Sequence, residues 1–275
     1  MFKVRKVLNN NALLTIDTQT QEEVIFIGNG VGFGQHMNQQ FIPRDGDVAY
    51  RHEAKVDLIP AVTKNDPIYL EIASAIIDEA KKEFGNIDTS ILLPLSDHIA
   101  FAIHRIQNNM VISNPFSHDI SLLFDQEYQA ALKARDIIEQ RLDIRINDEE
   151  VGYITLHIHS ARSDDQVSEG MLFAVLINES IQELEEAFSM NVDVHSLSYS
   201  RMLTHMKYLI ARTKNGEKLS IDMDEFTKNQ FPRAYEISKS IIKKTERALN
   251  KKIEPIEIGY LALHIQRVFS LEKSV

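Results

Sequence analysis

The chain of 275 residues contains no cysteine. This absence excludes disulfide bridges, thiol nucleophiles and thiolate zinc sites, and it leaves histidine and carboxylate groups as the candidates for reactive chemistry. A membrane span needs an apolar run of about 18 residues, and the sequence has no run of that length. It also has no charged leader followed by an apolar segment. We therefore expect a cytoplasmic protein without membrane insertion.

The formal net charge of −10 is unevenly distributed along the chain. Residues 1–56 contain six Lys/Arg and six Asp/Glu residues, so the whole acidic excess lies after residue 56. A nucleic-acid site, if present, therefore belongs at the N-terminus. Because that segment is neutral overall, the attraction for phosphate has to come from a local basic patch.

The N-terminal segment has the pattern of a small antiparallel sheet. Residues 2–8 alternate polar and apolar, asparagines at 9–11 supply a turn, and extended patterns follow at 12–17, 22–27 and near 48–51. About fifty residues bury little surface alone, so we expect this domain to dimerise. A period of two on the first strand places Lys3 and Arg5 on one face and Lys6 on the other.

A glycine-rich segment, GNGVGFG, occupies residues 28–34. It is followed by neither a helix carrying Lys-Ser/Thr nor a βαβ unit, so neither nucleotide-binding fingerprint is met. One interpretation is an ordinary tight turn. The other is a flexible backbone that approaches a nucleic acid, with Phe33 exposed to stack on a base.

The rest of the chain is one helical unit written twice. EVGYITLHIH (150–159) and EIGYLALHIQ (257–266) are identical at six of ten positions. Upstream, LSDHIAFAIHR carries His98 and Arg105, while MLTHMKYLIAR carries His205 and Arg212; the offsets 264 − 157 and 205 − 98 both equal 107. These repeats predict three domains, at residues 1–56, 57–168 and 169–275.

Capping signals place the histidines on helices. Helices are expected over 67–84 and 126–142, and further helices are expected to begin near residues 96 and 148. This puts His98, and by the repeat His205, in the first turn of a helix. Asn147 and Glu150 form a capping-box pair for the helix whose apolar stripe borders His157.

The matched histidines allow three interpretations. A single histidine beside an apolar stripe is usually structural, but four at matched positions are harder to explain in that way. A zinc site at His157 and His159 would need a strand, because a helix turns these residues to nearly opposite faces, and we expect no metal or cofactor. Phosphorylation fits better, since histidine can be an uncharged nucleophile near neutral pH.

Placing His98 and His205 at helix starts would bring a phosphoryl dianion near unpaired N–H groups, with Arg105 or Arg212 as its counter-charge. A dianion that arrives inside an interface repels acidic neighbours and can shift a dimer between arrangements. Such a site is a switch and not a catalyst, so we do not expect an enzyme.

Several segments resemble a known family. KVLNNN (6–11), IGNGVGFG (27–34) and the histidine segments SDHIAFAIHR, GYITLHIH, LTHMKYLIAR and GYLALHIQ resemble the transcriptional antiterminators that control bacterial sugar-uptake operons through the phosphotransferase system (PTS). SNPF (113–116) and LHIHSA (156–161) resemble the subgroup that serves glucose uptake. The resemblance covers essentially the whole chain. It implies a multidomain fold: a dimerising, antiparallel all-β RNA-binding domain followed by two homologous all-α helical-bundle PTS regulation domains.

The resemblance also implies a mechanism. As a homodimer, the N-terminal domain binds a hairpin in the leader mRNA and so prevents an overlapping terminator from forming. The positions that match the RNA-binding residues of the family are Lys6, Asn11, Gly28, Asn29, Gly30 and Phe33. Asn29 departs from the family pattern, which usually has a basic residue between the two glycines.

In the regulation domains, the resemblance implies that a sugar-specific permease component (enzyme II) phosphorylates His98 and His157 and silences the protein when sugar is absent. His205 and His264 match the sites that the phosphocarrier HPr phosphorylates. The rival hypothesis is a phospho-responsive protein-interaction module without RNA binding, whose N-terminus only dimerises.

Overall fold

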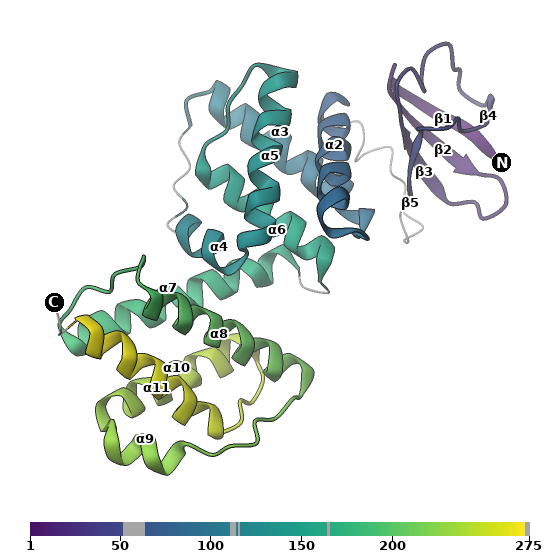
Figure 1. Cartoon of the computed structure of the whole chain (residues 1–275). Coiled ribbons are helices and arrows are strands. Elements are labelled where there is room, and N and C mark those ends of the chain that lie inside the picture. The colour runs from purple at the N-terminus through teal and green to yellow at the C-terminus, as the bar shows by residue number, and fades with distance from the viewer. Residues whose placement is uncertain (52–63, 111–113, 115, 164–165, 273–275) are drawn as a thin grey trace. The chain divides into compact units, whose positions relative to one another are not determined.

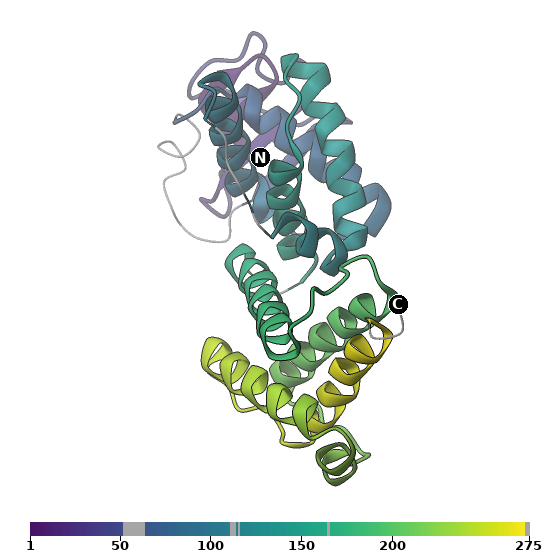
Figure 2. The same cartoon turned by 90° about the vertical axis from the view of Figure 1, so that its left-hand side faces the viewer.

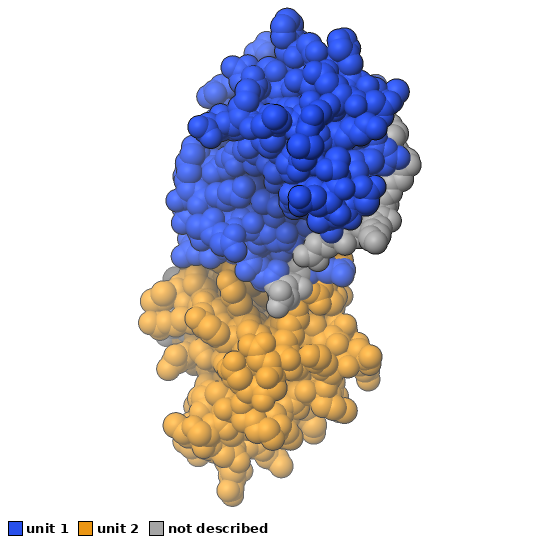
Figure 3. All heavy atoms as spheres, turned by 90° about the vertical axis from the view of Figure 1, so that its right-hand side faces the viewer, with its two compact units in different colours: residues 1–117, 124–167 blue, residues 118–123, 168–275 orange. Residues whose placement is uncertain are grey.

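The computed structural model describes residues 1–51, 64–110, 114, 116–163 and 166–272 (Figure 1). The chain forms two compact units, residues 1–117 with 124–167, and residues 118–123 with 168–275 (Figure 3). The predicted domain boundary at residue 56 lies outside the described residues, and the boundary at 168 stays a prediction. None of the helices in the described ranges is long and apolar enough to cross a membrane.

The N-terminal segment folds into the predicted antiparallel sheet, with strand order β4-β1-β2-β3-β5 (Figure 1). The strands are β1 (Phe2–Asn9), β2 (Ala12–Asp17), β3 (Glu23–Ile27), β4 (Gln40–Phe41) and β5 (Val48–Arg51). β4 was missed because two residues carry no period. A bulge interrupts the register between Val4 and Lys6, so Lys3 pairs with Ile16 and Lys6 with Leu14. Antiparallel partners share a face, hence Lys3 and Lys6 lie on the same face and the predicted opposite placement is wrong.

Both faces of the sheet are buried. One face forms its own core, in which the Phe26 ring meets Phe2 at 4.7 Å and Phe41 at 5.0 Å between centroids. The other face shares a core with helix α2 (Ile68–Phe84) and carries Tyr50, whose hydroxyl lies 2.7 Å from Ser74 Oγ. This second face fixes the sheet against the first helical repeat.

The first repeat contains α2, η1 (Thr89–Ile91), α3 (Leu92–Gln107), α5 (Asp125–Leu142) and α6 (Asp148–Arg162). Asp66 accepts a hydrogen bond from Ile68 N at 2.9 Å, and Gly85, with φ 77°, ends α2 as predicted. The apolar stripe of α6 is buried, so the hydrophobic period predicted this helix correctly.

The second unit contains α4 (Ser117–Leu123), α7 (Val167–Phe188), α8 (Leu197–Asn215), α9 (Asp224–Gln230), α10 (Pro232–Leu249) and α11 (Ile256–Glu272). The first residues of α4 and α7, Ser117 and Val167, belong to the first unit. α11 packs against α8, α9 and α10 (Figure 1 and Figure 2). Gly259 makes this approach possible, because a Cβ there would lie 2.8 Å from the backbone of Met223.

Candidate functional site

In the first repeat, helices α3 and α6 bring His98 and His157 together. Their ring centroids lie 5.4 Å apart, and Tyr153 lies at the same distance from His98. His157 is buried, whereas His98 keeps part of its ring exposed. The two histidines proposed as phosphorylation sites therefore form one cluster, although 59 residues separate them in the sequence.

A buried carboxylate anchors this cluster. Arg105 donates through Nη2 to both oxygens of Glu150, at 2.8 and 2.9 Å, and His98 Nε2 lies 3.2 Å from Glu150 Oε2. Burial raises the pKa of Glu150, but the contacts with His98 and Arg105 outweigh burial and hold the pKa of this carboxyl below its usual value. Asn147 caps α6 as predicted, since its side chain accepts a hydrogen bond from Glu150 N at 3.0 Å. The Glu150 side chain, however, contacts Arg105 and His98 and does not form the predicted capping box.

The second repeat rebuilds the same constellation from α8 and α11. The rings of His205 and His264 stack with centroids 4.5 Å apart. Arg212 donates to Glu257 through Nε at 2.7 Å and Nη2 at 2.9 Å, and His205 Nε2 lies 3.8 Å from Glu257 Oε2. Arg105 and Arg212, the predicted counter-charges for a phosphoryl group, are thus both bound to carboxylates.

The sequence predicted that His98 and His205 lie at helix starts, and this prediction is wrong. α3 begins at Leu92 and α8 at Leu197, so His98 lies in the second turn and His205 in the third. The sequence misled because the helix start was predicted from capping residue types near residue 96, whereas α3 begins at Leu92 without a side-chain cap and includes Pro94, which the first turn of a helix tolerates. Backbone N–H groups at these positions are used within the helix and are not free for an anion.

Burial keeps the imidazoles of His157, His205 and His264 neutral. Burial, with His98 close by, lowers the pKa of His157 to about 3. Burial, followed by the effects of His264 and Arg212, lowers the pKa of His205 to about 3. The pKa of His264 is lowered by burial and then by Arg267 and Arg201. A neutral ring keeps a nitrogen lone pair, which attack on phosphorus requires.

These pKa values predict that acid destabilises the protein. The folded state binds a proton on His157 more weakly than the unfolded chain, whose histidine pKa is near 6.5. The free energy of unfolding therefore falls as the pH drops below about 6.5 towards 3, by about 1.4 kcal/mol per pH unit for each such histidine. We expect the free energy of unfolding, measured with denaturant between pH 7.5 and 5, to depend less steeply on pH in His157→Gln than in the wild type. The exposed His104→Gln serves as control, and an equal slope in both variants would contradict the prediction.

His159 faces away from this cluster. Its Nδ1 lies 3.3 Å from Glu127 Oε1, and its ring meets Phe124 at 4.2 Å. His157 and His159 therefore have separate surroundings, as their helix requires. Within the described residues, no group of three or more His, Asp or Glu side chains is arranged to hold a metal ion.

Four of the RNA-binding candidates, Asn11, Gly28, Asn29 and Gly30, lie where the β1–β2 turn and the glycine segment meet, whereas Lys6 pairs with Leu14 within the sheet. Asn11 holds this turn, since Gly28 N donates to its backbone oxygen at 3.0 Å and Gly30 N to its Oδ1 at 2.8 Å. Gly30 has φ 68°, and a Cβ at Gly28 would lie 2.3 Å from Asp47 Oδ1, so both positions favour glycine. Phe33 is 75% exposed.

Arg44 supplies a cation that sequence reasoning missed. Its Nη2 donates to the Asn29 backbone oxygen at 3.0 Å and also lies 3.5 Å from Asp47 Oδ1, so the guanidinium is held at this turn by a carboxylate. No sequence pattern indicated this contact, because Arg44 lies 15 residues after Asn29 in a loop without a recognisable period.

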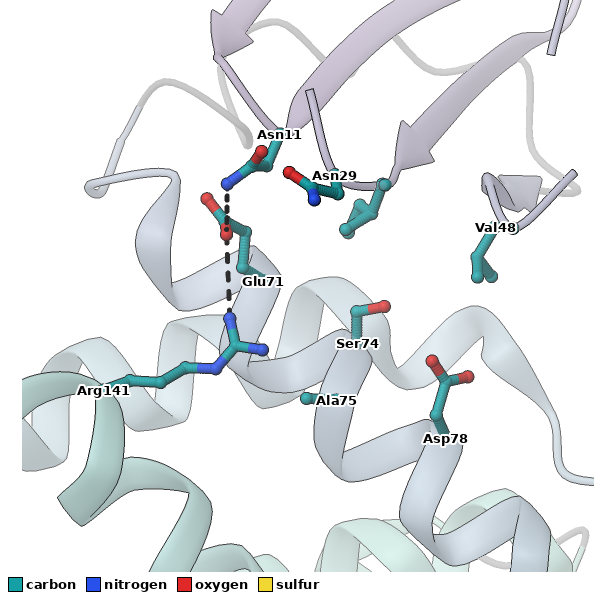
Figure 4. Close-up of a pocket in the computed structure, with 11 residues that line it drawn as sticks. Asn11, Asn29, Val48, Glu71, Ser74, Ala75, Asp78 and Arg141 are labelled. Carbon is teal, nitrogen blue, oxygen red and sulfur yellow. Dashed lines mark hydrogen bonds and ion pairs between the residues drawn. The ribbon is translucent and has the colours of Figure 1, made fainter. Parts of the chain in front are cut away.

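A carboxylate of the first helical repeat contacts the same turn (Figure 4). Glu71 of α2 accepts from Asn9 Nδ2 at 2.7 Å and from Asn11 Nδ2 at 3.1 Å, and Arg141 Nη1 lies 3.6 Å from it. A cavity of about 340 Å³ adjoins this contact, with Asn29 on the sheet side and Asp78 on the helix side. An acidic side chain therefore binds the side-chain amide of the RNA-binding candidate Asn11, together with that of Asn9.

Comparison with known proteins gives matches over the same regions. The family model of the CAT RNA-binding domain matches residues 2–48, and that of the PRD domain matches residues 71–161 and 178–268, which contain all four clustered histidines. The GlcA/glcB genes antiterminator of Staphylococcus carnosus is 31% identical over 274 residues, covering 96% of this chain and 94% of the relative. Protein GlcT of Staphylococcus haemolyticus is 32% identical, covering 96% and 95%. A crystal structure of GlcT CAT-PRDI is 31% identical with a TM-score of 0.53, covering 59% of this chain and 98% of that one.

Proposed function

Because the chain belongs to the family of RNA-binding transcriptional antiterminators that join a CAT domain to two PRD domains, we propose that it acts as a sugar-responsive homodimer in the cytoplasm. It binds a hairpin in a leader mRNA and prevents a terminator from forming. Lys6, Asn11, Gly28, Asn29, Gly30 and Phe33 contact the RNA, and Arg44 adds the positive charge that Asn29 does not supply. The protein regulates transcription and is not an enzyme.

Reversible histidine phosphorylation controls this binding. A sugar-specific enzyme II phosphorylates His98 and His157, and HPr phosphorylates His205 and His264. The observation that supports this most directly is the matched constellation of two imidazoles and a carboxylate–arginine pair in both repeats. A phosphoryl dianion that arrives beside Glu150 or Glu257 meets a buried like charge, so it destabilises the packing of α3 on α6 or of α8 on α11.

The Glu71 contact links the regulation domain to RNA binding. RNA phosphates and base edges compete with the Glu71 carboxylate for Asn9 and Asn11, and Glu71 and Asp78 repel phosphate by their charge. RNA binding therefore requires the turn to separate from α2.

The RNA-binding half of the proposal is tested by Phe33→Ala in the full chain. A base stacked on an aromatic ring contributes about 1 kcal/mol or more, so we expect at least about a fivefold loss of affinity for the leader hairpin in a mobility-shift assay. The matched control is Phe226→Ala, an exposed phenylalanine in the second unit. Equal binding by both variants, together with unchanged operon read-through, would favour the protein-interaction module without RNA binding.

A further inference from the structure

Two arginines beside the second histidine pair have no carboxylate partner among the residues that the structure describes. Arg201 precedes His205 by one helical turn on α8, and Arg267 follows His264 by three residues on α11, so each lies on the same helix face as its histidine. Both side chains line one hollow of about 510 Å³, together with Ser198, Gln266 and Ser270. In the described part of the chain, neither guanidinium forms an ion pair or a hydrogen bond, unlike Arg212 on Glu257.

We propose that Arg201 and Arg267 form an anion site that holds the phosphoryl group on His264. The inference rests on the proposed phosphorylation of this histidine and adds the residues that receive the charge. Guanidinium groups donate in a fork that matches phosphate oxygens, and two of them converging on one hollow suit a dianion better than a neutral ligand. The acidic net charge of the chain makes two unpaired arginines at one site unusual.

The ring geometry agrees with this assignment. His264 Nδ1 is buried without a hydrogen-bond partner in the described residues, so we assign the phosphoryl group to the other ring nitrogen, Nε2. The Nε2 lone pair forms the new P–N bond, while the P–N bond of the donor, a phosphohistidine protein, breaks and its electron pair stays on the donor nitrogen. The proton on Nδ1 stays on the ring, so the transfer consumes no water, metal or oxidant.

The first repeat has no arginine at either of the two matching positions. Subtracting the repeat offset of 107 places Pro94 opposite Arg201 and Ser160 opposite Arg267. Arg105, the arginine of the first cluster, is already bound by Glu150. The two repeats therefore treat the same modification differently: the second retains the phosphoryl group, and the first loses it readily.

The test treats the full chain with potassium phosphoramidate, a small donor that needs no protein docking, and maps phosphohistidine by mass spectrometry. We expect Arg201→Ala and Arg267→Ala each to shorten the half-life of the phosphoryl group on His264 by about tenfold, as loss of a charge-assisted contact predicts. Arg247→Ala, an exposed arginine on α10, is the charge-matched control and should leave the half-life unchanged.

Ser160→Arg provides the reciprocal test, since it places a guanidinium at the matching position in the first repeat and should lengthen the half-life on His157. Phosphorylated wild type whose His264 half-life equals that of both arginine variants would overturn the anion site. Wild type that takes no phosphate on His264, from phosphoramidate or from phosphorylated HPr, would instead overturn the proposed function in this repeat.

Discussion

Replacing Glu71 with alanine is expected to raise the affinity of the full chain for its leader hairpin by about tenfold or more. The carboxylate accepts from both Asn9 and Asn11, at 2.7 and 3.1 Å, and hydrogen bonds to a charged group contribute about 1.5–3 kcal/mol each. Because RNA binding has to break these contacts, their free energy is subtracted from the free energy of binding. Mobility-shift titration of unphosphorylated protein at fixed salt measures the difference.

Two variants of the same helix separate charge from hydrogen bonding. Glu83→Ala also removes a glutamate from α2, but Glu83 pairs with Lys133 and lies outside the cavity, so its effect on affinity should be small. Glu71→Gln keeps an acceptor for one asparagine and loses the charge, and it should fall between wild type and Glu71→Ala. Equal RNA affinity of Glu71→Ala and Glu83→Ala would show that the contact does not oppose RNA binding.

The sequence predicted those features that depend on a period or on a copy. The alternation in residues 2–8 and the extended pattern in residues 12–17 predicted the hairpin, because successive side chains on a strand point to opposite faces of the sheet. The offset of 107 residues gave both histidine pairs, and the structure brings each pair together. In these cases the local pattern and the tertiary packing agree.

Contacts between distant segments carried no such signal. Nothing local to Glu71 marks it as the partner of Asn11, which lies 60 residues away. Glu150 fitted a capping box by its spacing, but Arg105 and His98 are stronger partners for a carboxylate than a backbone N–H, and the tertiary contact prevailed. Likewise, the bulge after Val4 shifts Lys6 by one residue, an effect that periodicity alone does not contain.

Replacing Glu150 with alanine is expected to destabilise the first helical repeat by about 3–5 kcal/mol, the largest loss of stability among these variants. The substitution leaves the guanidinium of Arg105, which is only partly exposed, without the carboxylate that accepts hydrogen bonds from its Nη2 and Nε. Guanidinium denaturation followed by far-UV circular dichroism should show the first transition at lower denaturant. Glu149→Ala, one residue earlier on α6 and less buried, is the control and should cost about 1 kcal/mol or less.

A double variant decides whether the loss comes from the uncompensated charge or from missing packing. Arg105→Met with Glu150→Ala removes both partners, so if the charge is responsible, the double variant should be more stable than Glu150→Ala alone. If packing of the carboxylate is responsible, the two losses should add. The same comparison at Glu257 and Arg212 should also destabilise the second unit, because Arg212 donates to Glu257 through Nε and Nη2 at 2.7 and 2.9 Å. A buried pair that costs this much to break is also sensitive to a second negative charge beside it, which is why a phosphoryl group on a neighbouring imidazole can act as a switch.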